Sequence, residues 1–201
     1  MGHKVICISR DCGSGGHIVG EIAAKKLGIN YYDKNLIQLA MEYGGISSSV
    51  LHDADEKATN PAFYRLIYEG NDKVEKGRPA NEVLFQLQRD LIREITKKED
   101  CVIVGRCADY ILRNANVSMV NVYITAPKSM RIKREMTTDQ LTKFQAASLI
   151  RKIDDKRRKY YQYFTKREWG NPDMYDITLN SSHLGLERCA DILVHYYETY
   201  L

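Results

Sequence analysis

A glycine-rich turn near the start of the chain carries the residue types that bind phosphate. It follows residues 5–8, an apolar and largely β-branched run that is typical of a strand buried on both faces. The turn itself consists of Gly13, Ser14, Gly15 and Gly16. Glycines lack a Cβ, so their main-chain N–H groups can approach an anion closely. A helical pattern begins at Ile18, and the positive end of that helix dipole is expected to point at the same place.

The order strand, glycine turn and helix predicts a phosphate site. The residues expected to form it are Ser9, Gly13, Ser14, Gly15, Gly16 and His17. A standard P-loop reads G-x-x-x-x-G-K-[ST], in which the lysine reaches the terminal phosphates and the hydroxyl holds Mg²⁺. When the motif is aligned so that its second glycine falls on Gly15, Arg10 stands at the position of the first glycine. Gly16 then replaces the lysine, and His17 the hydroxyl residue. The alternative interpretation is that the turn only joins a strand to a helix.

Composition places the chain among ordinary globular proteins. Its 201 residues suit one domain, and 44% of them are hydrophobic and 28% charged. The net charge of +4 suits a protein that binds small anions and is too small to indicate nucleic acid as a partner. No membrane span or signal peptide is recognisable, so a cytoplasmic protein without a membrane partner is expected.

The cysteines indicate neither a disulfide framework nor a zinc site. They are odd in number, scattered and without a C-x-x-C pair, at Cys7, Cys12, Cys101, Cys107 and Cys189. We interpret Cys7 and Cys101, which lie in apolar strand-like runs, as small core residues, and Cys12 and Cys107 as packing residues. For Cys12 and Cys107, which lie in turns near the predicted phosphate site, a reactive thiol is the alternative.

Apolar runs alternate with helical patterns along most of the chain. Strands are expected at residues 5–8, 29–32, 101–104, 120–124 and 177–179. Three helices are expected at residues 47–57, 62–74 and 81–97, so the stretch from 34 to 99 reads as a helical insertion without strands. The remaining helices are expected from Ile18, at 108–113, from Pro127, at 141–167 and at 186–200. The pattern predicts an α/β fold with a five-stranded, mainly parallel sheet covered on both sides.

Ligands of such sheets bind at the carboxyl ends of the strands, so the residues that follow each strand are candidates for a site. Arg10, Asp33 and Arg106 each follow a predicted strand and are expected to share one cleft. For Arg106 the alternative is a surface guanidinium paired with an acid. For Asp33 the alternative to a substrate or Mg²⁺ contact is a helix N-cap.

The predicted helix at 141–167 has a charged face. Arg151, Asp154, Asp155 and Arg158 recur at spacings of three and four, with Arg157 at the edge of that face. Such a helix could be a mobile lid that brings arginines onto phosphates and excludes water. The alternative is a solvated surface whose charges pair with one another. Tyr160, Tyr161 and Tyr163 are expected to pack this helix rather than to stack on a base.

Several segments together resemble the cytidylate kinase-like family, a branch of the P-loop nucleoside monophosphate kinases. They are SRDCGSGGHIVGEIAAKKLG, NYYDKNLI, VIVGRCADYIL, KIDDKRRKYYQYFT and WGNPDMYDITLNSSHLG. The resemblance implies a single kinase domain over 1–201, with a three-layer P-loop kinase fold. It further implies a monophosphate-binding insertion at 34–99 and a helical lid at about 140–168. It implies an ATP- and Mg²⁺-dependent kinase that converts CMP or dCMP to the diphosphate.

The resemblance and the strand-end argument together yield the site residues. Substrate contacts are assigned to Asp33, Arg106 and Asp109, and Mg²⁺ contacts to Ser14 and Asp33, with Ser9 or water as further candidates. The charges expected to act in catalysis are those of Arg10, His17, Arg106, Arg151, Arg157 and Arg158. The chain departs from the family by having His17 where an arginine is typical.

Phosphoryl transfer to a monophosphate needs little besides positioning and positive charge. The acceptor phosphate has a second pKa of about 6, so its oxygen is ionised near neutral pH and no general base is required. Because the lysine is missing, Arg10 or protonated His17 is expected to supply its charge. Two other functions stay open: a nucleotide-binding regulator with weak or no catalysis, and a kinase of another small acceptor. The oligomeric state is not predicted.

Overall fold

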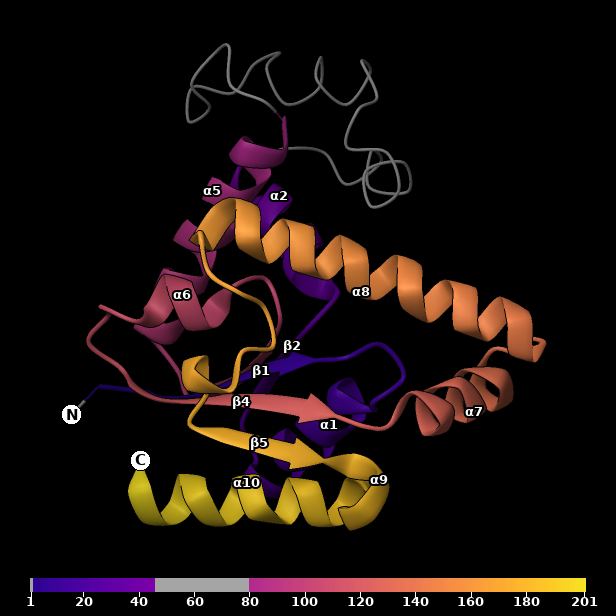
Figure 1. Ribbon diagram of the computed structural model, residues 1–201. Helices are drawn as coiled ribbons and strands as arrows, with labels where there is room; N and C mark the ends of the chain where they lie inside the picture. Colours follow the sequence, from indigo (N-terminus) through magenta and orange to yellow (C-terminus); the bar gives the residue numbers. More distant parts are fainter. Residues whose placement is uncertain (1, 46–79) are drawn as a thin grey trace. The chain divides into compact units, whose positions relative to one another are not determined.

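The computed structural model describes residues 2–45 and 80–201, and its centre is a five-stranded parallel sheet (Figure 1). The strands are β1 (Lys4–Arg10), β2 (Asn30–Tyr32), β3 (Cys101–Val104), β4 (Ser118–Thr125) and β5 (Ile177–Asn180). Their order is β2-β3-β1-β4-β5, and β1 pairs in parallel with both β3 and β4. The predicted α/β fold is confirmed, and all five strands lie where the apolar runs placed them.

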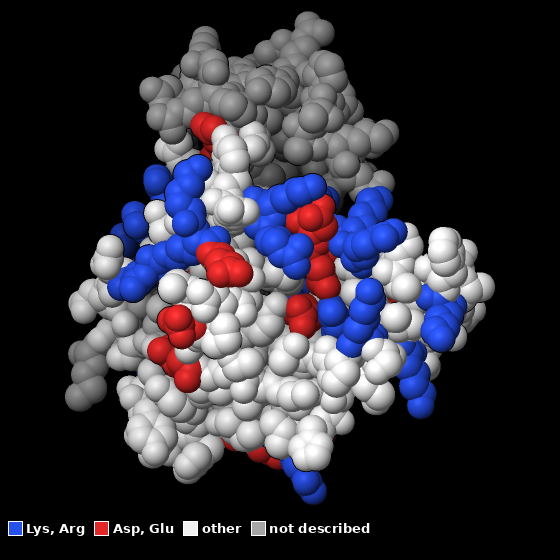
Figure 2. Space-filling model, viewed as in Figure 1, with Lys and Arg blue, Asp and Glu red and all other residues white. Residues whose placement is uncertain are grey.

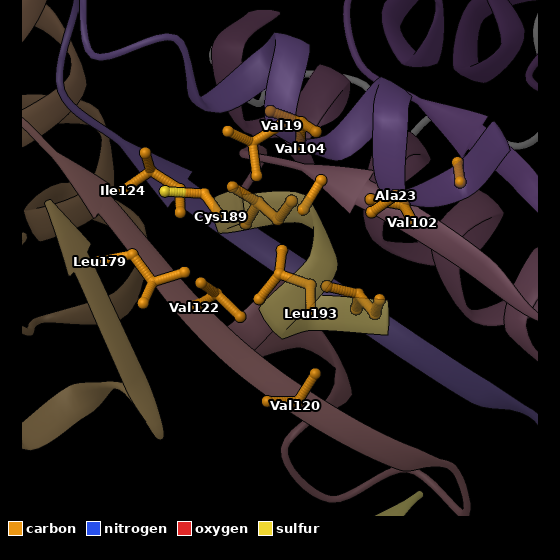
Figure 3. Packing of buried hydrophobic residues seen from close by; sticks show 14 of the residues in the cluster. Val19, Ala23, Val102, Val104, Val120, Val122, Ile124, Leu179, Cys189 and Leu193 are labelled. Atoms are coloured by element: carbon orange, nitrogen blue, oxygen red, sulfur yellow. The ribbon is translucent and has the colours of Figure 1, made fainter. Parts of the chain in front are cut away.

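Two helices cover one face of the sheet and form the main core with it. They are α1 (Gly16–Leu27) and α10 (Leu186–Tyr200). Val19 and Ala23 of α1 and Leu193 of α10 are fully buried against the valines and isoleucines of β1, β3 and β4 (Figure 3). Because β1 is covered on both faces, its central residues are all apolar, as expected for the middle strand of a parallel sheet.

The remaining helices of this part of the chain follow β3, β4 and β5. They are α6 (Ala108–Leu112), α7 (Lys128–Thr138), α8 (Lys143–Thr165) and the short α9 (Ser181–Leu184), with a 3₁₀ turn at Pro172–Met174. Figure 1 shows α8 on the opposite side of the strands from α10. Helix α8 begins with a capping box in which Thr142 and Gln145 satisfy each other's main-chain N–H groups. Pro127 is the N-cap of α7, one residue before the helical position predicted for it.

The chain divides into two compact units. One comprises Met1–Tyr31 and Thr96–Leu201, and the other comprises Tyr32–Ile95. In the second unit the structure describes α2 (Asn35–Tyr43) and α5 (Ala80–Thr96), and α5 corresponds to the third predicted helix of the insertion. The helices predicted at 47–57 and 62–74 lie outside the described residues. Within the described ranges, no helix is long and apolar enough to cross a membrane.

The alternative interpretation of Asp33, as the N-cap of a helix, is not supported. Lys34 occupies the N-cap position of α2 and makes no side-chain cap. Instead, the main-chain N–H of Asp33 donates to Asn35 Oδ1 at 2.9 Å, and its carbonyl accepts from Leu36 N at 3.1 Å. The first turn of α2 is therefore held by main-chain groups and by Asn35.

A cluster around Asp100 ties the amino-terminal edge of the sheet together. Its carboxylate accepts from Tyr197 Oη at 2.5 Å, His3 Nδ1 lies 2.8 Å away, and Lys4 N donates at 3.0 Å. Burial opposes ionisation of Asp100, but these hydrogen bonds outweigh it and lower the pKa of the carboxyl. This edge is the one opposite to the carboxyl ends where ligands bind.

Asp100→Asn is expected to lower the free energy of unfolding by about 1 kcal/mol at neutral pH, because the carboxylate is only partly buried. Since the folded-state pKa is depressed, the wild-type contribution is present above the unfolded value of about 4 and is lost as pH falls through the folded pKa. Urea denaturation between neutral and acid pH measures it. Glu187→Gln, which alters an exposed carboxylate paired with Lys26, is the control. Equal acid sensitivity of Asp100→Asn and wild type would contradict the assignment.

Candidate active site

The glycine turn joins β1 to α1 at the carboxyl edge of the sheet. Gly13 and Gly15 adopt left-handed conformations, with φ of 75° and 80°. A Cβ on Gly13 would lie 2.9 Å from the carbonyl oxygen of Arg131, and one on Gly15 would lie 2.6 Å from Leu186 Cδ2. Both positions therefore require glycine for conformation and for space.

Three main-chain donors of the turn are unused. The N–H groups of Gly13, Gly15 and Gly16 make no hydrogen bond to any group in the described parts of the chain. They lie at the N-terminus of α1, whose first turn contains no acidic residue. Orphan donors at a helix N-terminus are a ready site for an anion, so the turn fits phosphate.

Asp11 fastens the turn to β4. Its two carboxylate oxygens accept from Tyr123 Oη and from Thr125 Oγ1, each at 2.7 Å. Its main-chain N–H donates to Ile124 O at 3.1 Å. Burial and the neighbouring Asp11 carboxylate raise the pKa of Tyr123, so the phenol stays protonated and continues to donate. Sequence reasoning missed this role of Asp11, although an acid directly after a cleft-facing arginine was a visible signal.

Ser14 and Ser9 are not placed to bind Mg²⁺ in this conformation. Ser14 is fully buried, its Oγ donates to Asp11 O at 2.9 Å, and its carbonyl accepts from Ser181 Oγ at 2.5 Å. Ser9 is also buried and hydrogen-bonds Tyr175. Across residues 2–45 and 80–201, no group of three or more His, Cys, Asp or Glu could hold a metal ion. Mg²⁺ often binds through one or two carboxylates, water and the substrate phosphates, which this arrangement permits.

Side chains of α7 and α8 form hydrogen bonds with the main chain of Arg10 and Cys12. Arg131 Nη1 donates to Asp154 Oδ2 at 2.6 Å and to Cys12 O at 3.2 Å, and Cys12 N donates to Asp154 Oδ1 at 2.8 Å. Arg157 Nη1 donates to Arg10 O at 2.9 Å. Asp154 is only 8% exposed, so the alternative interpretation of a fully solvated helix face does not hold for this residue. The buried Asp154 carboxylate is the counter-charge of Arg131 and accepts a hydrogen bond from the main-chain N–H of Cys12.

Arg134 stands beside the glycine turn without a carboxylate partner. Its Nη1 donates to Gly13 O at 2.5 Å and would lie 3.2 Å from a Cβ on Gly15. No acid within the described ranges is in ion-pair contact with it, and burial lowers the pKa of its guanidinium. Arginine nevertheless stays charged, and the neighbouring Glu135 carboxylate favours that charge without forming an ion pair, so a cation lies beside the turn that fits an anion. The i, i+3 spacing of Arg131 and Arg134 on one predicted helix was the available sequence signal.

A charged pocket of about 500 Å³ opens between α7 and α8. It is lined by Lys128, Arg131, Ser148, Ile150, Arg151, Lys152, Asp154, Asp155 and Arg158. Both carboxylates are already paired, Asp154 with Arg131 and Asp155 with Lys159 at 2.7 Å. Lys128, Arg151 and Lys152 have no ion-pair partner among the residues that the structure describes. Figure 2 shows basic side chains interspersed with a few acidic ones over this face. The pocket therefore carries excess positive charge and suits an anionic ligand.

The comparisons with known proteins agree with this geometry. The family model described as "Cytidylate kinase-like family" matches residues 5–183. The chain belongs to the cytidylate kinase-like family. A curated cytidylate kinase of Sulfolobus acidocaldarius is 23% identical to it over 189 residues, which cover 94% of this chain and 91% of that protein.

Solved structures of other proteins share this fold. An uncharacterized protein from Eubacterium ventriosum superposes with a TM-score of 0.71 at 25% identity, covering 98% of this chain and 99% of that one. Shikimate kinase from Bacteroides thetaiotaomicron superposes with a TM-score of 0.55 at 15% identity, covering 96% and 98%. The cytidylate kinase-like chain therefore shares the P-loop kinase fold with shikimate kinases.

Arg10 is the last residue of β1 and Arg106 follows β3, which is adjacent to β1, so both lie at one edge of the sheet. A Cβ on Gly105 would overlap Arg10 Nη1, so the Arg10 guanidinium lies against the residue that precedes Arg106. Gly105, Arg106 and Cys107 are three consecutive left-handed residues, with φ of 78°, 56° and 55°. For the two non-glycine residues this costs roughly 1–2 kcal/mol each. Arg106 itself makes no hydrogen bond or ion pair with the described residues.

Asp109 does not face a ligand in this family member. It is 7% exposed and accepts a hydrogen bond from Tyr161 Oη at 2.5 Å, and its burial raises the pKa of its carboxyl. Its assignment as a substrate contact is therefore not supported, since the carboxylate holds α8 in place. Tyr161 packs α8, as expected, and Tyr160 packs on Phe164 with ring centroids 4.8 Å apart.

The remaining predicted residues are dispersed. His17 is exposed in the first turn of α1, and Arg151 and Arg158 line the pocket. Asp33 belongs to the second compact unit. Cys12 and Cys107 are buried, and burial raises the pKa of both thiols, that of Cys12 to about 12, so neither is a reactive thiolate at neutral pH.

Proposed function

We propose that this member of the family is an ATP-dependent kinase that phosphorylates a pyrimidine nucleoside monophosphate, CMP or dCMP, to the diphosphate. The observation that carries the proposal is the set of unused N–H groups at Gly13, Gly15 and Gly16, at the N-terminus of α1. The name of the Sulfolobus acidocaldarius relative, cytidylate kinase, supports the choice of acceptor.

The reaction needs alignment and charge. An acceptor phosphate oxygen attacks the γ-phosphorus of ATP, the bond from that phosphorus to the bridging oxygen breaks, and ADP leaves. No proton has to be removed, because the acceptor phosphate is ionised near neutral pH. The glycine turn would hold the ATP phosphates, and Arg106, Arg151 and Arg158 would neutralise charge on the transferring and acceptor phosphates. Asp11, Arg131 and Asp154 would position the turn without touching substrate.

Two segments complete the proposed site. Residues 34–99 would be the insertion that binds the monophosphate, with Asp33 at its start, and residues 140–168 would be the lid. In the lid, Arg157 holds Arg10 O in the structure, so its role is to position the turn rather than to bind phosphate. Mg²⁺ supplies charge neutralisation between the phosphates, and Asp33 is the candidate carboxylate for it.

One observation favours a second function, a nucleotide-binding regulator. Gly16 stands where the P-loop lysine is expected, and loss of one such donor costs on the order of 3 kcal/mol of barrier. The glycine turn would then bind nucleotide without efficient transfer. A kinase of a different small acceptor is the third candidate, and the fold shared with shikimate kinases supports it.

Product analysis separates the three functions. Purified protein is incubated with ATP, Mg²⁺ and, in turn, CMP, dCMP, UMP, AMP and shikimate, and ADP is measured together with the phosphorylated product. A Gly15→Val variant, whose side chain would strike Leu186, is prepared in parallel to exclude a contaminating kinase. CDP or dCDP formation by wild type alone supports the proposal. ATP binding without turnover favours the regulator, and another product favours the third candidate. Absence of both binding and turnover would exclude all three.

A further inference from the structure

The space around Gly16 explains why the P-loop lysine is absent. Gly16 is the first residue of α1, and its φ is not left-handed, so its backbone would accept any L residue. Yet a Cβ at this position would lie 2.5 Å from Arg10 Cβ, 3.0 Å from Arg10 Cγ and 3.2 Å from Ile124 Cβ. Real Cβ atoms do not come so close to another carbon. The stem of Arg10 therefore occupies the space in which a lysine side chain at position 16 would begin.

The other end of the Arg10 side chain meets a second glycine. A Cβ on Gly105 would overlap Arg10 Nη1, and Gly105 lies directly after β3 with φ of 78°. The Arg10 side chain thus runs from the glycine turn, where the donor phosphates fit, to the end of β3 beside Arg106. Gly16 leaves space for the Cβ and Cγ atoms of Arg10, and Gly105 leaves space for its guanidinium. The main chain of Arg10 is held as well, because Arg157 donates to its carbonyl oxygen.

We propose that Arg10 and Gly16 have exchanged the roles that the first glycine and the lysine hold in a standard P-loop. Arg10 is then the catalytic residue that supplies the missing positive charge, and Gly16 is glycine because the arginine stem crosses it. A guanidinium that spans the donor turn and the end of β3 is placed to bind the phosphoryl group passing between them. This inference rests on the proposed kinase function and assigns to Arg10 a charge for which His17 was the other candidate.

A packing test needs no activity. Gly16→Ala should lower the melting temperature by roughly 3–8 °C, because the added methyl group strikes the Arg10 stem. In an Arg10→Gly background the same change should cost less than about half as much, because the collision is relieved. Equal costs in the two backgrounds would overturn the proposed packing of Arg10 on Gly16.

A kinetic test uses four proteins. Arg10→Gln should lower kcat with the best acceptor by about 10²–10³-fold, the loss expected for one charge-stabilising donor. Gly16→Lys alone should lower kcat by a similar factor, because the Arg10 side chain occupies the space that the lysine side chain needs. The double variant Arg10→Gly/Gly16→Lys restores the standard arrangement and should exceed both single variants by about tenfold or more. Arg188→Gln, an exposed arginine of α10, is the matched control. An Arg10→Gln enzyme within about threefold of wild type, or a double variant no better than the worse single variant, would overturn the inference.

The pH profile separates Arg10 from His17. An imidazole loses its charge near pH 6.5, whereas a guanidinium keeps its charge over the whole assay range. Under the Arg10 assignment, the decline of kcat above neutral pH should have the same shape in wild type and in His17→Arg. A flatter decline in His17→Arg would transfer the role to His17.

Failure of the kinase function remains distinguishable from failure of this inference. If wild type binds ATP without turnover, the proposed kinase activity is contradicted. The ATP affinities of the same four proteins then still test the role of Arg10. Arg10→Gln should then weaken ATP binding by about tenfold or more, with ADP as the comparison ligand. If wild type does not bind ATP, both proposals are overturned.

Discussion

Replacing Asp154 by asparagine is expected to lower the free energy of unfolding by about 3 kcal/mol. The carboxylate is 8% exposed, and it pairs with Arg131 at 2.6 Å and accepts from Cys12 N at 2.8 Å. Asparagine keeps the shape but leaves the Arg131 guanidinium without a full counter-charge, since Asp11 Oδ1 is 4.0 Å away. Urea denaturation followed by circular dichroism measures the loss.

Asp155→Asn is the matched control for this variant, because it alters the next residue on the same helix. Asp155 is about half exposed and pairs with Lys159 at the surface, so its replacement should leave the free energy of unfolding nearly unchanged. A loss of the same size in both variants would show that the charge at 154 has no special structural role. ATP binding should also weaken in Asp154→Asn and not in Asp155→Asn, since Asp154 holds the Cys12 main chain that leads directly into the glycine turn.

Replacing Arg134 by glutamine is expected to raise the Kd for ATP by about 10–100-fold, the value of one or two charge-assisted hydrogen bonds. Its guanidinium stands at the glycine turn, with Nη1 2.5 Å from Gly13 O, and no acid among the described residues pairs with it. A charge that makes no ion pair contributes little to folding and much to binding an anion. The melting temperature should therefore change little, in contrast to Asp154→Asn.

Isothermal titration with ATP and with a nucleoside lacking phosphate tests the role of Arg134. Only the phosphorylated ligand should be affected, because the guanidinium recognises charge. Arg188→Gln on α10 serves again as the control, since it removes an exposed arginine distant in sequence from the turn. An unchanged ATP affinity in Arg134→Gln would remove this arginine from the site.

Local signals predicted most of the fold. The apolar runs at residues 5–8 and 101–104 are typical of buried strands, and the helices between them predicted that the strands run parallel. The last helix begins and ends at Leu186 and Tyr200, as predicted, because Gly185 precedes it and its apolar positions recur with helical spacing. Helix ends were predicted less well. Helix α1 begins at Gly16 rather than at Ile18, α8 covers Lys143–Thr165 rather than 141–167, and Pro127 is an N-cap, because helix ends depend on geometry as well as on residue type.

The site was predicted less completely, because charge alone does not reveal partners. Asp154 and Asp155 are adjacent in the sequence and equally acidic, yet one is buried against Arg131 and the other lies at the surface beside Lys159. Asp109 is an acid of the kind expected to contact a substrate, but its carboxylate accepts a hydrogen bond from Tyr161 instead. Each of these roles depends on which distant segment packs against the residue.

The sequence by itself determined that a glycine turn joins the first strand to the first helix, because spacing and the loss of Cβ atoms are local properties. It also determined that position 16 lacks the lysine. Only the tertiary structure decided that Arg10 fills the space of that lysine, since this depends on Gly16 and Gly105 approaching one side chain from separate parts of the chain. Contacts between segments about ninety residues apart follow from packing, and no local pattern encodes them.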